Sequence, residues 1–148
     1  SSPLGATTEI TLHLPALLPA DYCGDVHERL TLYKRLASCE RPDALESVHE
    51  ELVDRFGKLP DPARALIETH RLRIQSQPLG IVRIDAAAEA IQFQFVPSPP
   101  IPPERIIRFI QIRRDAKLAG PDRLRLTVAS TDLASRLARI REVIKALS

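Results

Sequence analysis

The segment from Arg29 to Arg64 constrains the fold most, because clear signals mark where its helices begin and end. Pro42 suits the first position of a helix, where its missing N–H costs nothing. Gly57 suits the left-handed residue that ends a helix. Asp61 and Pro62 together open another. The segment therefore predicts two amphipathic helices and the start of a third, joined by short connections.

Apolar residues in this region recur at helical spacing. Asp25 and Glu28 have the spacing of a capping box, which predicts the start of the first helix. The residues that we expect the three helices to bury are, in order, Val26, Leu30, Tyr33 and Ala37 with Leu36 beside them; Leu45, Val48, Leu52 and Phe56; and Leu66, Ile67 and Ile74.

The rest of the chain predicts short strands and two further helices. We expect strands at residues 9–14, 81–84, 90–96 and 124–128, with the second and third paired as a hairpin. The proline-rich residues 97–103 predict a stiff surface loop. The two helices are expected to bury Ile106, Ile107 and Ile110, and, after a cap at Ser130 or Thr131, Leu133, Leu137, Ile140 and Ile144.

Strands and helices that group rather than alternate predict an α+β fold. In this fold, three N-terminal helices form a layer against a small, mostly antiparallel sheet with C-terminal helices. The length of 148 residues favours a single domain, expected at residues 9–148. Residues 1–8 are expected to be a leader that is disordered or derived from an expression vector.

Composition narrows the class of protein. No apolar run approaches the roughly 20 residues that cross a bilayer, and the N-terminus lacks the pattern of a secretory signal. The only two cysteines, Cys23 and Cys39, are too few for a disulfide framework, which favours a reducing cytoplasm. The chain begins at Ser1 and contains no methionine, as expected for a piece of a longer polypeptide.

Charge is distributed unevenly along the chain. Residues 1–59 carry ten acidic and six basic side chains, whereas residues 104–148 carry five acidic and eleven basic ones. A chain that is acidic at the front and basic at the tail predicts either internal pairing or two different partners.

The sequence lacks the usual motifs of catalysis and metal binding. His27 and His49 each precede a glutamate, but a zinc peptidase motif would need a second histidine at Thr31 or Val53. The five glycines are isolated, which excludes a glycine-rich phosphate loop. We therefore predict no catalytic residue, no metal site and no cofactor.

Carboxylates gather on the side of the second helix opposite its apolar stripe. Ser47, Glu50, Glu51 and Asp54 all lie on that side, and Glu50 and Asp54 form a like-charge pair four residues apart. We expect the fold to leave Glu51 and Asp54 unneutralised. A solvated acidic surface would account for the pattern. A docking site for a basic partner would account for it equally, since such charges set specificity and association rate.

The basic tail also has two interpretations. Arg136, Arg139, Arg141 and Lys145 alternate with the apolar stripe of the last helix, as on any solvated helix. An alternative function is a nucleic-acid-binding accessory module that uses this helix. The chain has no aromatic residue after Phe109, so stacking on bases is not available there.

Three strings of residues resemble a known family. Residues 29–38 read RLTLYKRLAS, residues 51–64 read ELVDRFGKLPDPAR, and residues 17–22 read LLPADY. They resemble the C-terminal domain of bacterial transcription-repair coupling factors, sharply over residues 9–80 and only in general terms afterwards.

The resemblance implies a function for the chain. Members of this family are ATP-driven DNA translocases that act on stalled RNA polymerase and recruit excision repair. Their C-terminal domain lacks the motor and docks on an N-terminal excinuclease-B-like module, which masks the surface that excinuclease A binds. Glu51 and Asp54 match acidic positions of that contact, and Glu50 and Ser47 lie beside them. DNA would be bound by the parent motor, and no membrane is implied.

Overall fold

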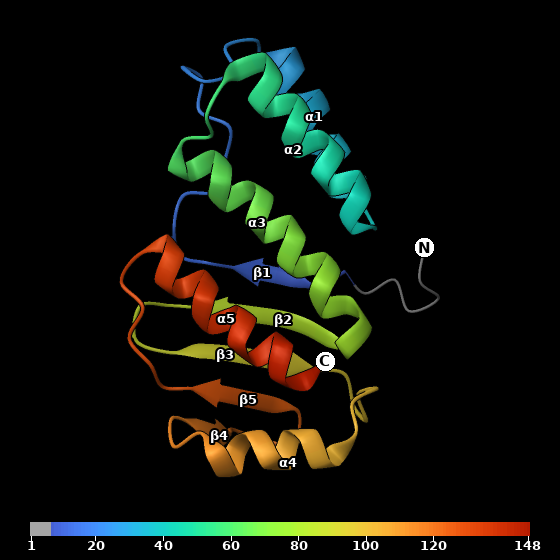
Figure 1. Cartoon of the computed structure of the whole chain (residues 1–148), viewed down its shortest axis with the longest axis vertical. Coiled ribbons are helices and arrows are strands. Elements are labelled where there is room, and N and C mark those ends of the chain that lie inside the picture. Colours follow the sequence, from blue (N-terminus) through green and yellow to red (C-terminus); the bar gives the residue numbers. More distant parts are fainter. Residues whose placement is uncertain (1–6) are drawn as a thin grey trace. The chain divides into compact units, whose positions relative to one another are not determined.

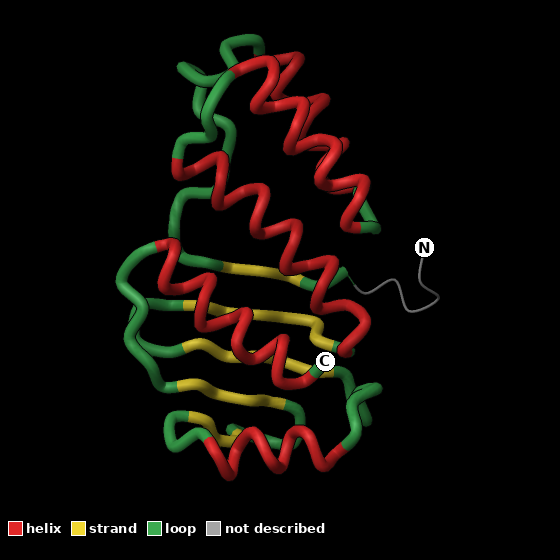
Figure 2. Tube along the Cα trace, in the orientation of Figure 1, coloured by secondary structure: helices red, strands yellow, loops and turns green. Residues whose placement is uncertain are grey.

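The computed structural model describes residues 7–148, which form two compact units. The helical unit comprises Leu14–Ile74, and the sheet unit comprises residues 7–13 and Gln75–Ser148. The chain thus enters the sheet unit, leaves it for the helical unit and then returns. Figure 2 shows one region made of helices and another in which strands and helices combine.

The helical unit contains helices α1 (Val26–Ser38), α2 (Pro42–Phe56) and nearly all of α3 (Asp61–Ser76). Pro42 is the first residue of α2 and Gly57 ends it, as predicted. Gly57 has the positive φ expected, 89°, but its ψ of −165° lies outside the left-handed helical region that was predicted. The buried stripes predicted for α2 and α3 are confirmed for Leu45, Val48, Leu52, Leu66, Ile67 and Ile74.

The buried face of α1 differs from the prediction. Leu36 is buried as predicted, and Leu32, which was not predicted, is buried as well. Val26 and Leu30 are 56% and 52% exposed, and Ala37 is exposed too. Asp25 caps the helix as predicted and accepts hydrogen bonds from the amides of His27 and Glu28. The side chain of Glu28, expected to close a capping box, instead forms an ion pair with Arg55.

The sheet unit contains a five-stranded sheet in the order β1-β2-β3-β5-β4. The strands are β1 (Glu9–Thr11), β2 (Ile81–Ala86), β3 (Ile91–Phe95), β4 (Ala116–Leu118) and β5 (Arg123–Leu126). Only the β1–β2 pairing is parallel among these described strands. The predicted α+β class, the mostly antiparallel sheet and the β2–β3 hairpin are therefore confirmed.

Helix α5 (Leu133–Leu147) lies across one face of this sheet (Figure 1). Its Leu137, Ile140 and Val143 are buried, as are the residues that alternate along the strands, Ile84, Ile91, Phe93, Leu124 and Leu126. The opposite face carries polar side chains, including Arg83, Gln94 and Arg123, which occupy neighbouring positions in the register.

Several boundaries in the sheet unit differ from the predictions. β1 ends at Thr11, and β4 lies where no strand is predicted. Helix α4 (Pro103–Ile112) buries Phe109, whereas Ile107 is 54% exposed. The cap of α5 is Asp132, which accepts a hydrogen bond from the Ser135 amide, instead of Ser130 or Thr131.

The structure describes only residues 7 and 8 of the leader predicted at residues 1–8. Residues 1–6 of that leader lie outside the described residues. Thr8 is buried, and its hydroxyl donates a hydrogen bond of 2.6 Å to the carbonyl of Ile81. Among residues 7–148, no helix has both the length and the apolar character needed to cross a membrane.

Candidate functional site

The outer side of α2 carries the four polar residues singled out by sequence, and we call Ser47, Glu50, Glu51 and Asp54 the acidic face. Leu45, Val48 and Leu52 anchor the opposite side of the helix in the core of the helical unit. Tyr22 strengthens the end of the helix, because its hydroxyl donates to the carbonyls of Leu52 and Gly57. The acidic face therefore lies on a fixed element.

Glu51 is not a bare carboxylate. Arg35 of α1 donates to both of its oxygens, at 2.9 and 3.0 Å, and Arg55 donates to Oε2 at 3.1 Å. The hydrogen bond from Arg35 holds the pKa of Glu51 below its usual value, because it favours the charged carboxylate. The expectation that the fold leaves Glu51 unneutralised is therefore wrong.

Asp54, Glu50 and Ser47 differ from Glu51. All three are exposed, and neither Asp54 nor Glu50 forms an ion pair within residues 7–148. Glu46, at the other margin of the helix, is held by Arg71 of α3 at 3.2 Å. The acidic face thus has two carboxylates free for a partner, flanked by carboxylates that arginines of the same unit already bind.

The residues of the basic tail are partly committed to the fold. Arg136 is 2% exposed and donates to the carbonyls of Ser130 and Leu12. Arg139 forms an ion pair of 2.8 Å with Glu142. This helix therefore presents fewer free cations than its sequence indicates, which weakens the nucleic-acid alternative.

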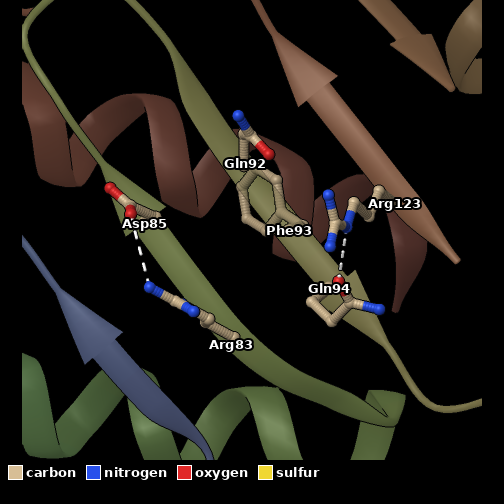
Figure 3. Close-up of a pocket in the computed structure, with 6 residues that line it drawn as sticks. All are labelled: Arg83, Asp85, Gln92, Phe93, Gln94 and Arg123. Carbon is tan, nitrogen blue, oxygen red and sulfur yellow. Dashed lines mark hydrogen bonds and ion pairs between the residues drawn. The ribbon is translucent and has the colours of Figure 1, made fainter. Parts of the chain in front are cut away.

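A polar pocket of about 180 Å³ lies on the open face of the sheet, and sequence reasoning did not anticipate it. Figure 3 shows that its polar side chains pair with one another: Arg83 with Asp85, at 3.7 Å, and Arg123 with the neutral Gln94, to which it donates at 2.8 Å. Asp85 also lies 2.6 Å from the imidazole of His13. These pairings explain the arrangement without a ligand.

The described part of the chain brings together no group of three or more histidine, cysteine, aspartate or glutamate side chains that could hold a metal ion. Cys23 and Cys39 are buried free thiols. The acidic face is therefore the strongest candidate for a functional site, and its exposed carboxylates are of the kind that pair with cations.

Comparisons with known proteins place this geometry in a family. Residues 12–106 match the family model of the TRCF domain. The chain is 37% identical to the transcription-repair-coupling factor of Escherichia coli over 141 residues, which cover 95% of the chain and 12% of that protein. It is 43% identical to the Haemophilus influenzae protein of the same name over 103 residues, 70% of the chain and 9% of that protein.

A solved structure shares the fold. The crystal structure of the C-terminal domain of a transcription-repair coupling factor aligns with a TM-score of 0.81 at 21% identity, covering 96% of this chain and 92% of the other. The chain thus spans about a tenth of the length of its curated relatives. It belongs to the transcription-repair coupling factor family as a C-terminal domain, which is not itself a motor domain.

Proposed function

We propose that this domain is a non-catalytic docking module that restrains its parent protein. In this proposal it binds the N-terminal excinuclease-B-like module of the same protein and masks the surface that excinuclease A binds. The parent would couple the release of stalled RNA polymerase to excision repair in the cytoplasm, and would contact DNA through its ATP-driven motor. The observation that carries the proposal is the exposed carboxylate of Asp54 beside Glu50, which forms no ion pair with any of residues 7–148 and lies on a helix packed against the core of its unit.

The geometry indicates that the carboxylates of the acidic face would contribute unequally to binding. Asp54 and Glu50 have no cationic partner in the described chain, so an arginine from a partner would gain a full ion pair there. Glu51 already has Arg35 and Arg55 as partners, so an incoming arginine would gain less from it. Val53, 41% exposed on the same helix, adds apolar surface to the contact.

Isosteric substitutions test whether Asp54 contributes more to binding than Glu51 does. We expect Asp54→Asn to weaken binding to the purified N-terminal module roughly tenfold by calorimetry, and Glu51→Gln to weaken it less. Lysine is avoided at position 51, because it would stand beside Arg35 and Arg55. The matched control is Glu40→Gln, an exposed carboxylate outside α2 that should leave affinity unchanged.

Salt dependence provides a second readout. Affinity of the unaltered domain should fall between about 50 and about 300 mM salt, because exposed charges are screened over this range. Equal affinities for Asp54→Asn and the unaltered domain would exclude the acidic face as the docking surface.

A further inference from the structure

The face of the sheet opposite α5 carries cations on its last two strands. The register places Lys117 of β4 opposite Arg125 of β5, and Arg125 opposite Gln92 of β3. Arg123 lies two residues from Arg125, so it points to the same face, where Gln94 is its cross-strand neighbour (Figure 3). We call Gln92, Gln94, Lys117, Arg123 and Arg125 the cationic face.

The charges of the cationic face are not neutralised by the fold. Lys117 and Arg125 are exposed and form no ion pair within residues 7–148. Arg123 donates at 2.8 Å to the amide oxygen of Gln94, which is neutral. Like charges directly opposite one another on neighbouring strands destabilise a sheet. An anion bound over Lys117 and Arg125 would relieve their repulsion.

Carboxylates are kept away from the cationic face. Strands β3, β4 and β5 contain no aspartate or glutamate. Glu9 and Asp85 belong to β1 and β2, at the other end of the strand order, and Asp85 already lies 2.6 Å from the imidazole of His13. Asp122 precedes β5 and, by the alternation of the strand, shares the side of buried Leu124. Residues 7–13 and 75–148 together carry twelve basic and eight acidic side chains, a net charge of +4.

The chemistry of the cationic face indicates what kind of partner fits. Its five side chains are all polar or charged, whereas a protein–protein interface has an apolar core. Protein–DNA interfaces are more polar and more positively charged, and phosphate oxygens accept hydrogen bonds from lysine, arginine and glutamine. Unpaired bases would find no stacking surface on these strands, because Phe93 and Phe95 are 0% and 7% exposed.

We propose that the cationic face binds the phosphate backbone of duplex DNA without reading its sequence. Lys117, Arg123 and Arg125 supply the charge, and the two glutamines supply neutral donors beside them. Contacts of this kind give weak binding, with a dissociation constant on the order of 10 to 100 μM at physiological salt. The acidic face lies on α2 of the helical unit, so its docking and this binding can fail independently.

The test uses the whole 148-residue chain and a fluorescein-labelled DNA duplex of about 20 base pairs. We expect saturable binding by fluorescence anisotropy. With three phosphate contacts, the association constant should fall about 40-fold between about 50 and about 200 mM salt, a log–log slope of about −2.7. Duplexes of unrelated sequence should bind within about twofold of one another, because phosphate contacts carry no sequence information.

A matched pair of lysine variants locates the site. Lys117→Gln removes a charge from the cationic face, whereas Lys145→Gln removes the same charge from an exposed position on α5, which covers the other face of the sheet (Figure 1). We expect Lys117→Gln to weaken binding severalfold and to reduce the salt slope by about 0.9, and the addition of Arg125→Gln to reduce it by about as much again. Lys145→Gln should leave affinity within about twofold.

Thermal unfolding separates loss of binding from loss of structure. Lys117→Gln ends the repulsion between Lys117 and Arg125, so its melting temperature should equal or exceed that of the unaltered chain. A lower melting temperature would show that this repulsion is absent and would contradict the argument from the like-charge pair.

Three binding results would overturn the proposal. One is the absence of saturable DNA binding at about 50 mM salt. Another is an equal loss in Lys117→Gln and Lys145→Gln, which would mean that net charge alone attracts DNA. The third is tighter binding of a polyglutamate peptide than of the duplex, lost in the Lys117→Gln, Arg125→Gln double variant, which would assign the face to an acidic protein segment instead.

Discussion

The helical unit and the sheet unit each bury one arginine on backbone carbonyls, but the two arginines link very different parts of the chain. Arg73 donates to the carbonyls of Leu36 and Cys39 at the end of α1, 37 and 34 residues away. Arg136 donates to the carbonyl of Leu12, 124 residues away. The helical unit is therefore held by links within one continuous segment, whereas the sheet unit depends on residues from both ends of the chain.

The two units also differ in how far their surface arginines form ion pairs. In the helical unit, arginines of one helix pair with carboxylates of another, as Arg35 does with Glu51 and Arg71 with Glu46. In the sheet unit, Arg113 pairs with Glu142 of α5 in the same way, but Arg105 and Arg108 form no ion pair within the described residues. Within the described residues, the charge left unpaired is thus negative on α2, at Glu50 and Asp54, and on α4 it consists of Arg105 and Arg108 beside Glu104.

The largest expected effect concerns the buried arginine of the sheet unit. Arg136→Met removes every donor at that position and leaves the carbonyls of Ser130 and Leu12 without this partner. We therefore expect the free energy of unfolding to fall by about 3 kcal/mol. The matched surface change, Arg35→Met, should cost less than about 1 kcal/mol, because exposed ion pairs add little. Urea unfolding measures both, and equal losses would contradict the contrast between buried and exposed arginines.

A pH effect of intermediate size is expected in the helical unit. Burial and the nearby Arg73 lower the pKa of His70 from 6.5 to about 4, and the guanidinium of Arg73 lies 3.2 Å from its Nδ1. The folded state therefore resists protonation, so the stability from neutral His70 is complete above pH 6.5 and is lost as the pH falls toward 4. Because His70 is partly exposed, we expect the free energy of unfolding to fall by roughly 2 to 3 kcal/mol over this range.

The fluorescence of Tyr22 and Tyr33 can monitor unfolding of the helical unit at each pH, since both tyrosines lie in that unit. Denaturant titrations between pH 7 and about 5 measure the slope before most carboxylates titrate. His70→Gln stays neutral and should remove the slope in this range. A slope that survives in the variant would show that another group is responsible.

The smallest effect concerns the local signal that starts α1. Asp25→Ala removes the side chain that binds the amides of His27 and Glu28, and we expect a loss of about 1 kcal/mol. Asp25→Asn keeps an oxygen acceptor and should cost much less. Thermal unfolding of the two variants compares them, and equal losses would mean that charge rather than capping stabilises this end.

The difference between local signals and contacts between elements explains which predictions succeeded. Pro42, Gly57 and the stripe of Leu45, Val48 and Leu52 are local signals, so the sequence alone predicted α2 correctly. In α1, two apolar sets compete at helical spacing, Val26 with Leu30 and Leu32 with Leu36. Contacts with other helices decide between them, and local periodicity does not contain that information.

Long-range contacts account for the other errors. β4 has only three residues and no alternating pattern of its own, so its pairing with β5 defines it. The carboxylate of Glu51 looked free because an argument from one helix omits Arg35, which reaches it from α1. The residues of the candidate site were thus identifiable, while their partners required the fold.

The separation between Arg136 and Leu12 bears on synthesis of the chain. A ribosome releases the whole of residues 14–74 before it makes the last helix, so the helical unit has all its residues available early. The sheet unit forms later, because β1 can pair only after β2 has emerged, and the carbonyl of Leu12 can accept its hydrogen bond only after Arg136 has been made. During that interval we expect β1 to depend on chaperones for protection against aggregation.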